Sequence, residues 1–588
     1  MNGFYGRILK IDLTAQRWSD EKIDDDVLQT FLGGKGLATY LLYRHNPTGV
    51  DPLAPENCLI FATGPATGSP VWGGCRYGVF TKSPQTGLYA ESYSGGKVPE
   101  AIAATGYDAV LIQGACASPT ILSVTPNGVS FHGAGDLWGM ETYDAEDAVV
   151  KRFTSSEAEY KRSGAVVIGP AAENGIRFAV IKNDHWRSAG RTGVGTVMGA
   201  KGIKAVLFQG DRQRRYHDEE GLRDFAKRMV IEGRENPGVK AYKSMGTSQM
   251  VKIMNTARAF PTRYWTQGVC PHWEAISADA LHTRCEVVPH ACLKCFMACG
   301  RMTRVKEGRH AGLKIEGPEY ETIYAFGGLC MVASIEEIAY LNDICDRLGM
   351  DTITAGNLCA FAIEAARRGK IDTAIDYGDA DAIAILLRQI AGREGVGAVL
   401  ADGIRPAAKA WGLEDIAVHV KGMEPAGYDP RPLKGMGLAY ATSDRGACHL
   451  RATFYKPELS GMIDPGQVKG KAELFVDFED RLTLFDTLIL CRFYRDLYPW
   501  EMLQEMLQAL TGMDVDLPRL RRHAADIATL TRRFNLREGL TRQDDRLPQK
   551  LHRRLEDSDL VVTEAEIDEM VQDYYRLRGW DEHGHPID

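Results

Sequence analysis

The sequence predicts an α+β protein in which a β-rich N-terminal domain is followed by a mainly helical remainder. The first 210 or so residues are rich in glycine and in short β-branched runs, which Gly, Pro and Ser clusters separate. From about Asp218 onward, amphipathic helical periodicity replaces the strand signals. At roughly 150 residues per domain, a chain of 588 residues would hold three or four domains, and because large single units also occur we expect two or three.

Individual elements can be placed in chain order. The strand candidates alternate or are continuously apolar, and they are Tyr5–Leu13, Leu59–Thr63 and Ala109–Gln113. Ser334–Glu337 has the capping-box pattern, and apolar residues then recur at helical steps until Gly349 ends the helix. Two further helical runs are Thr354–Arg368 and the apolar stripe Leu474, Phe478, Leu482 and Phe485, which ends at Asp486.

Composition places the chain among ordinary globular proteins. The net charge of −8, with 44% hydrophobic and 9% aromatic residues, excludes disordered, collagen-like and fibrous classes. The chain has no apolar stretch of membrane-spanning length and no signal-peptide pattern at its start, so we expect a cytoplasmic protein without a membrane span. Acids interleave the arginine-rich segment 519–554, which favours a solvated helical face over nucleic-acid binding.

Three of the 13 cysteines crowd together in the sequence. Cys292, Cys295 and Cys299 have C-x2-C-x3-C spacing, which can direct three thiolates to one soft metal centre. An iron–sulfur cubane needs a fourth thiolate, which must come from the other ten cysteines. A structural zinc site is the alternative, although no second closely spaced pair follows. The spacing favours the cluster.

Glycine-rich loops and one carboxylate–imidazole pairing are the other candidates. Such loops let backbone N–H groups approach phosphate, but for any single loop a tight turn in a β-rich domain is the better explanation. None has P-loop or Rossmann spacing. They are Gly33–Gly36, Gly73–Arg76, Ser94–Lys97 and Arg187–Gly195. Glu316–Glu321 and Ala441–His449 supply a carboxylate and an imidazole that could divide proton transfer between them.

Together these residues resemble the tungsten-dependent aldehyde:ferredoxin oxidoreductase family. The likeness runs from the first strand to the C-terminus, in an order that chance similarity does not produce. Besides the cysteine triplet, the matching stretches are Gly74–Pro84, Ile168–Asn174, Arg187–Gly199, Glu316–Glu321, Asp346–Asp351, Tyr428–Arg431, Tyr440–His449, Phe534–Leu540 and Tyr575–Trp580.

The resemblance implies three domains. An N-terminal β-rich domain, residues 1–210, would form the base for a tungsten ion bound by two molybdopterins. Two mainly helical domains would follow it, residues 211–425 with the cysteine triplet and residues 426–588 with the fourth cluster cysteine. Molybdenum could replace tungsten, because the pterin dithiolenes dominate the coordination.

The resemblance also implies which residues of the first domain bind the cofactor. Arg76 would lie between a pterin and the cluster, and backbone groups of Tyr93 and Ser188 would hold a Mg²⁺ that bridges the pterin phosphates. Tyr93 stands where the family often has Asn, and Ser188 where it usually has Ala. The other residues of the implied phosphate loops are Ser94, Gly95, Arg187, Gly190, Arg191 and Gly193.

Two aspartate loops would each hold one pterin. The first contributes Asp346, Gly349, Met350 and Asp351, and the second contributes Asp486, Leu490 and Cys491. Ile489 replaces the glycine expected in the second loop, so a left-handed backbone is costly there and its turn could differ from the first. The resemblance makes Cys491 the fourth ligand of the [4Fe–4S] cluster.

Glu321 and His449 match the family's proton-handling pair. The implied activity is oxidation of aldehydes to carboxylic acids, with electrons passing through the cluster to ferredoxin or to an iron–sulfur partner subunit. The alternative within the family is the tungsten subunit of a benzoyl-CoA reductase-type enzyme. The segment 340–343 lacks the Glu-x-x-His motif of metal-bridged dimers, which leaves another homodimer or a hetero-oligomer.

Overall fold

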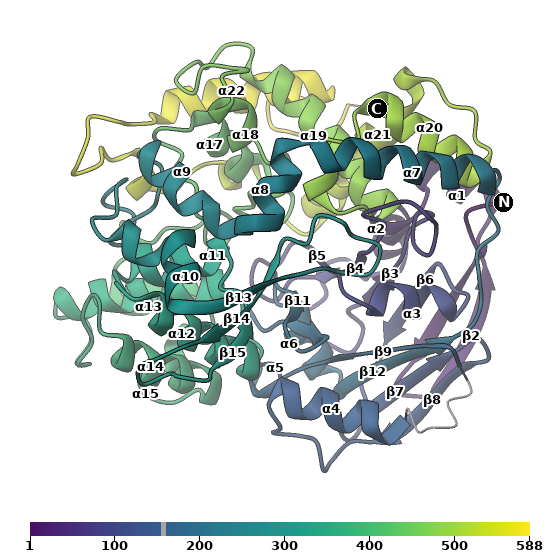
Figure 1. Cartoon of the computed structure of the whole chain (residues 1–588), viewed down its shortest axis with the longest axis horizontal. Coiled ribbons are helices and arrows are strands. Elements are labelled where there is room, and N and C mark those ends of the chain that lie inside the picture. The colour runs from purple at the N-terminus through teal and green to yellow at the C-terminus, as the bar shows by residue number, and fades with distance from the viewer. Residues whose placement is uncertain (154–159, 588) are drawn as a thin grey trace. The chain divides into compact units, whose positions relative to one another are not determined.

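The computed structural model describes residues 1–153 and 160–587 and groups the chain into two compact units (Figure 1). The first unit consists of Met1–Val239, Ala291–Met297 and Asp480–Glu538. The second consists of Lys240–His290, Ala298–Glu479 and Gly539–Asp588. The division into three domains at residues 210 and 425 stays a prediction.

Two six-stranded sheets form the centre of the first unit. The first has the order β2-β1-β6-β3-β4-β5 and the second β11-β10-β9-β12-β7-β8. In each sheet one pair of strands is parallel, β1 with β6 and β7 with β12. The strands are β1 (Arg7–Asp12), β2 (Arg17–Lys22), β3 (Leu59–Ala62), β4 (Tyr77–Lys82), β5 (Tyr89–Ser94), β6 (Ala109–Gln113), β7 (Thr120–Thr125), β8 (Gly128–Gly133), β9 (Arg162–Val167), β10 (Ile181–Asn183), β11 (Arg187–Ala189) and β12 (Ile203–Gly210).

Helices cover these sheets. The helix α3 packs on β9 and β12, while α2 packs on β3, β4 and α21, and α7 packs on α20. Two helices, α8 (Pro237–Met245) and α19 (Lys471–Leu488), cross from one unit into the other. The remaining helices of the first unit are α1 (Asp25–Phe31), α2 (Gly34–His45), α3 (Val98–Ala104), α4 (Thr142–Phe153), α5 (Pro170–Glu173), α6 (Val194–Ala200), α7 (Glu219–Glu235), α20 (Trp500–Thr511) and α21 (Leu517–Arg537).

The second unit is mainly helical and contains one small antiparallel sheet, β13-β14-β15. Its strands are β13 (Cys285–His290), β14 (Gly300–Val305) and β15 (Lys314–Glu316). Its helices are α9 (Met250–Thr256), α10 (Ala278–Arg284), α11 (Tyr320–Thr322), α12 (Ile335–Leu348), α13 (Thr352–Arg367), α14 (Ala380–Gly392), α15 (Gly395–Leu400), α16 (Ile404–Trp411), α17 (Lys434–Thr442), α18 (Tyr455–Leu459) and α22 (Glu564–Arg578).

The predicted fold class is confirmed. All twelve strands of the two large sheets lie within residues 7–210, and the three expected strands are β1, β3 and β6. Helix α12 begins after Ser334 as expected, and the Ser334 side chain accepts from the Glu337 N–H at 3.3 Å. The Glu337 carboxylate instead pairs with Arg309, at 2.6 Å. The predicted helix over the apolar stripe is α19, which ends two residues later than expected, at Leu488.

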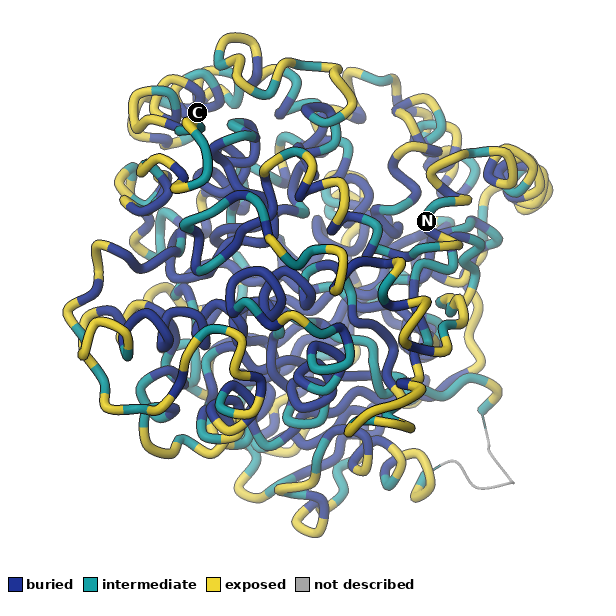
Figure 2. Tube along the Cα trace, turned by 60° about the vertical axis from the view of Figure 1, so that its left-hand side comes forward, coloured by how far each residue is buried: buried dark blue, intermediate teal, exposed yellow. Residues whose placement is uncertain are grey.

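The small sheet was not predicted, although the cysteine triplet lies on the loop between β13 and β14. In both units the exposed stretches are mainly loops and outer helical turns (Figure 2). No helix among the described residues is long and apolar enough to cross a membrane.

Candidate functional site

Thiols gather around Ala291–Met297 of the first unit, the cysteine loop. Cys292 and Cys295 are half-buried on that loop, and Cys491 is buried in the segment after α19. Cys75, which the cysteine spacing did not single out, is hydrogen-bonded to Cys292. Cys299 belongs to the second unit. The group of thiols in the first unit therefore consists of three of the four predicted cluster ligands and Cys75.

Hydrogen bonding and positive charge stabilise the thiolate form of Cys292. The hydrogen bond from Cys75 is the largest influence, and Arg187 and Arg76 add to it against desolvation, so the pKa of Cys292 is lowered to about 5. Arg76 also donates to Cys491 Sγ at 3.5 Å. Burial disfavours the Arg76 charge, but nearby thiolates, Cys491 first, raise its pKa. These surroundings suit soft, anionic ligands of a metal centre.

The cysteine loop is joined to the Cys491 segment by backbone hydrogen bonds. The Gly73 N–H donates to Lys294 O at 3.0 Å, and Gly73 O accepts from the Cys491 N–H at 2.8 Å. The Tyr494 hydroxyl lies 3.6 Å from Cys295 Sγ. Gly73 has φ +83°, and a Cβ there would lie 2.8 Å from the Tyr494 ring. Only glycine fits this contact without rearrangement.

The two predicted phosphate-binding loops are joined by Asn183. Its Oδ1 accepts from Ser94 Oγ at 2.7 Å, and its Nδ2 donates to Gly95 O at 2.9 Å. Asn183 also pairs with Arg187 across the β10–β11 hairpin. Gly95 lies directly against the cysteine loop, since a Cβ there would be 2.7 Å from Cys292 Sγ. The first unit thus brings both loops together beside the thiols.

Cationic side chains accompany the second of these loops. Lys182 is fully buried, and its Nζ donates to Ser188 Oγ at 2.8 Å. Arg191 is only 6% exposed. Gly193 precedes α6 in the left-handed conformation, whereas a Cβ at Gly190 would meet nothing closer than 3.6 Å. Buried cations beside a glycine-rich turn are the combination that binds phosphate.

Tyr93 connects the first loop to the second aspartate loop. Its hydroxyl donates to Glu91 Oε2 at 2.6 Å, and Lys35 donates to Glu91 Oε1 at 3.0 Å. The Arg492 guanidinium lies 5.8 Å from the centre of the Tyr93 ring and pairs with the Asp486 carboxylate. Tyr93 therefore takes part in a charged network between the two loops.

The second aspartate loop keeps the left-handed turn despite the missing glycine. Ile489 has φ +66°, close to the +79° of Gly349 in the first loop. The Leu490 N–H donates back to Phe485 O at 2.7 Å. The turn that the sequence left open therefore resembles the first one.

The first aspartate loop lies in the second unit, between α12 and α13. Gly349 ends α12, and the Met350 N–H donates to Cys345 O at 2.8 Å. The Asp346 carboxylate accepts from a neighbouring Asn side chain at 2.8 Å. The Asp351 carboxylate caps α13 by accepting from two backbone N–H groups, at 3.1 and 3.3 Å. Asp351 is therefore the N-cap of α13 and satisfies two of its first backbone N–H groups.

Glu321 and His449 meet in the second unit. His449 Nε2 lies 3.4 Å from Glu321 Oε1, and the Gly427 N–H donates to Glu321 Oε2 at 3.0 Å. The Tyr428 ring stacks with the His449 ring at 5.5 Å and with the Tyr455 ring at 4.1 Å. Glu321 lies on α11, which continues as the π-helical segment Ile323–Leu329. Such segments often occur at functional sites.

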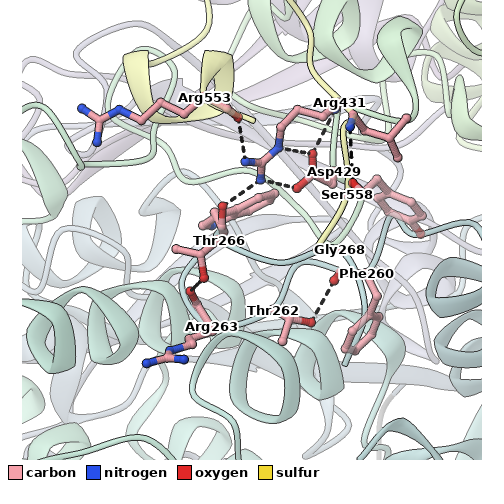
Figure 3. Close-up of polar contacts among 12 residues, drawn as sticks. Phe260, Thr262, Arg263, Thr266, Gly268, Asp429, Arg431, Arg553 and Ser558 are labelled. Carbon is pink, nitrogen blue, oxygen red and sulfur yellow. Dashed lines mark hydrogen bonds and ion pairs between the residues drawn. The ribbon is translucent and has the colours of Figure 1, made fainter. Parts of the chain in front are cut away.

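Asp429 and Arg431 anchor the loop that carries Gly427 and Tyr428. Both are buried and form an ion pair, and the Arg431 guanidinium also donates to Trp265 O at 2.8 Å and to Arg553 O at 3.2 Å (Figure 3). The Asp429 N–H donates to Ala259 O at 3.0 Å. The Tyr428–Arg431 motif therefore holds in place the residues that touch the Glu321–His449 pair.

The thiols of the first unit are chemically suited to a centre of several soft metal ions. No three His, Cys, Asp or Glu side chains within residues 1–153 and 160–587 converge as one metal ion requires. A cubane cluster separates its thiolates more widely than one ion does. Cys292, stabilised as a thiolate next to the narrow Gly95 contact, is suited to such a cluster.

Sequence reasoning missed several residues of these sites. Cys75 directly precedes Arg76, and Gly427 directly precedes the Tyr428–Arg431 motif, so proximity to a motif was the available signal. Lys182 and Arg492 each contact a predicted residue six positions away in the sequence, Ser188 and Asp486, but no motif marked them.

Models of the aldehyde ferredoxin oxidoreductase family match almost the whole sequence. The model of the N-terminal domain matches residues 8–210, and the model of domains 2 and 3 matches residues 224–588.

Curated relatives agree with this match, and a solved structure has the same fold. The chain is 32% identical to the tungsten-containing aldehyde ferredoxin oxidoreductase of Pyrococcus furiosus, over 99% of this chain and 97% of that protein. It is 28% identical to the aliphatic sulfonate oxidoreductase, WOR-like subunit, of the same organism, over 100% and 96%. A chain of the active site complex BamBC of benzoyl coenzyme A reductase, with 1,5 dienoyl-CoA, superposes with a TM-score of 0.84 and 24% identity, over 100% and 96%.

Proposed function

This chain belongs to the aldehyde ferredoxin oxidoreductase family of tungsten oxidoreductases, and we propose that it oxidises aldehydes to carboxylic acids. An aldehyde and water become a carboxylic acid, two protons and two electrons. The observation that carries the proposal is the Glu321–His449 pair, which supplies a proton acceptor and a hydrogen-bond donor 3.4 Å apart.

We assign the cofactors to the residues that the sequence predicted. Cys292, Cys295, Cys299 and Cys491 would hold one [4Fe–4S] cluster, from which electrons pass to ferredoxin or to an iron–sulfur partner subunit. A tungsten bis-molybdopterin, which supplies the two-electron oxidation when bound, would be held by the phosphate loops, a Mg²⁺ and both aspartate loops. Its predicted partners are Arg76, Tyr93, Ser94, Gly95, Arg187, Ser188, Gly190, Arg191, Gly193, Asp346, Gly349, Met350, Asp351, Asp486, Leu490 and Cys491.

In the proposed reaction Glu321 and His449 divide the proton handling. His449 donates a hydrogen bond to the aldehyde oxygen and polarises the carbonyl, and Glu321 accepts a proton when water adds to the carbon. The Gly427 N–H holds one oxygen of Glu321, so the other stays directed at His449. The stacked Tyr428 ring restrains the imidazole. Because Glu321 and His449 are already held in position, less free energy is needed to orient them for the reaction.

The benzoyl-CoA reductase alternative is not favoured over aldehyde oxidation. At 24% identity, the likeness to the BamBC chain carries the fold alone. The 32% identity to a tungsten-containing aldehyde ferredoxin oxidoreductase supports the aldehyde. Because a relative at 28% identity is an aliphatic sulfonate oxidoreductase, sulfonates belong among the test substrates.

The test begins with protein purified without oxygen. We expect tungsten and iron without zinc by mass spectrometry, and aldehyde-dependent reduction of benzyl viologen. Glu321→Gln should retain the tungsten and lower turnover by at least about 100-fold, as the loss of a general base does. Glu319→Gln, in the same motif but hydrogen-bonded to Thr247, is the matched control and should turn over nearly as the native enzyme does. Native turnover in Glu321→Gln would contradict the assigned role, and activity with only sulfonates or thioesters would contradict the substrate.

A further inference from the structure

A cleft of about 180 Å³ opens on the first unit, and arginines dominate its charge. We call it the arginine cleft. It lies among the start of α7, the end of α3 and the segments around residues 68 and 212. Its charged lining consists of Arg162, Arg212, Arg214 and Arg223, with Glu100 and Glu219 as the acids.

The arginine cleft borders the cysteine loop. Lys294, between Cys292 and Cys295, donates from Nζ to Ser69 O at 2.7 Å, and the flanking residues Gly68 and Pro70 line the cleft. Trp72 gives a second connection. Its Nε1 donates to Ala226 O on α7 at 3.1 Å, and its ring lies 5.5 Å from that of Phe296, on the cysteine loop. The cleft and the thiols are therefore adjacent parts of one surface.

The lining of the cleft holds four arginines against two glutamates, and the exposed acids Asp211, Asp218, Glu220 and Asp224 flank it in the sequence. Arg214 is buried and compensated by Asp108 at 3.0 Å, and Arg223 pairs with Glu219 at 2.9 Å. Arg162 lies 3.5 Å from Glu100, while Arg212 is exposed. Lys97 and Lys294 add two cations on the side of the cysteine loop, against Asp184, whose carboxylate accepts from the Lys97 backbone N–H at 2.7 Å. With −8 on the whole chain, an acidic partner needs such a local attraction.

An apolar centre completes the surface. Leu293 is 42% exposed, whereas Cys292 and Cys295 on the same loop are half-buried. Trp72, whose ring lies against that of Phe296 on the same loop, is half-buried. Apolar and aromatic residues surrounded by arginines are typical of protein–protein interfaces.

We propose that the arginine cleft and the cysteine loop together dock a small acidic iron–sulfur electron carrier. The inference rests on the proposed function, because it requires a cluster at the cysteine loop. Each encounter would move one electron from the reduced cluster of this chain to the oxidised cluster of the carrier, without making or breaking a bond. Carboxylates of the carrier would face Arg212, Arg223 and Lys97, and its apolar surface would cover Leu293.

The test measures binding and turnover separately, with the full chain purified without oxygen. Binding of an oxidised acidic ferredoxin is measured by calorimetry at low and at high salt. The variant is Arg212→Glu/Arg223→Glu. The control is Arg519→Glu/Arg522→Glu, which makes the same charge change at another depression of the same unit, lined by Arg519, Arg522 and Asp26. All four arginines are exposed, so both variants should fold.

We expect the Kd for ferredoxin to rise at least about tenfold in the cleft variant at low salt and less than twofold in the control. The difference should shrink at high salt, and dye-linked aldehyde turnover should stay within twofold of native in both. An unchanged Kd in the cleft variant, or an equal rise in both variants, would overturn the docking site. The docking site would also be overturned if the cleft variant bound ferredoxin as the native chain does and lost only the binding of inorganic phosphate or only self-association. A native chain that binds ferredoxin but shows no aldehyde turnover would refute the proposed function and leave the docking result standing.

Discussion

Gly95→Ala is the most direct test of the contact between the predicted phosphate loop and the cysteine loop. The added Cβ would lie 2.7 Å from Cys292 Sγ and 3.4 Å from Cys75 O. The backbone at Gly95 is not in the left-handed region, so alanine itself is allowed there. Any effect must therefore come from the contact with the thiol.

The size of the effect follows from the overlap. Non-bonded heavy atoms of this kind are most stable at roughly 3.5–4.0 Å. A contact of 2.7 Å therefore forces a displacement of about 1 Å in the loop or in the thiol. Overpacking of this kind typically costs about 1–3 kcal/mol. The displacement falls on a predicted cluster ligand, so cluster occupancy should fall along with stability.

Iron content, the EPR spectrum of the reduced protein and the melting temperature are the measurements. Gly190→Ala is the matched control, because its Cβ would meet only Ser188 Cβ, at 3.6 Å, in the same group of loops. We expect less iron and an altered spectrum in Gly95→Ala, and native values in Gly190→Ala. If the two variants have the same iron content, spectrum and melting temperature, Cys292 does not lie against Gly95 in the protein.

Three further changes test other parts of the structure. Arg431→Met should lower stability by about 3–5 kcal/mol, because it leaves the buried Asp429 carboxylate uncompensated, and adding Asp429→Leu should recover most of the melting temperature. Burial lowers the pKa of Lys550 from 10.5 to about 7. Between these pH values the folded protein binds fewer protons than the unfolded chain, so the stability of the fold rises with pH. Lys550→Met should therefore raise the melting temperature most at or below pH 7, and the gain should shrink toward pH 10.5. Cys75→Ala removes the hydrogen bond to Cys292 and should lower the potential of the cluster in an EPR redox titration, whereas an unchanged potential would mean that Cys75 does not reach the cluster sulfur.

The fold was largely predictable because its signals are local. The buried strand Ala109–Gln113 was predicted at its observed bounds, since a short apolar run between turn residues suffices to mark it. The sheet around the cysteine triplet was missed. Only one residue of its strand β13 is buried, so the strand lacks the alternation of buried apolar residues that marks a strand.

The candidate site was predictable where motifs carry it and not where tertiary packing does. Glu321 and His449 come from two motifs more than a hundred residues apart, and the structure brings them within 3.4 Å. Cys75 has no spacing relative to the triplet that marks it as a neighbour of Cys292. The contact between Cys75 and Cys292 arises from tertiary packing, which the spacing of residues in the sequence does not reveal.

Ile489 shows how packing can override a local preference. A β-branched residue in the left-handed region costs roughly 1–2 kcal/mol, which favours glycine there. Yet the Ile489 side chain is fully buried, and its Cδ1 lies 2.9 Å from where a Cβ on Gly34 would be. Burying such a side chain contributes about 1.5–3 kcal/mol, and removing it from a packed core costs about 2–5 kcal/mol. The packing gain therefore exceeds the backbone strain. Gly34 leaves room for the Ile489 side chain, because a Cβ at Gly34 would clash with it. The aspartate loop therefore keeps its shape with an isoleucine at this position.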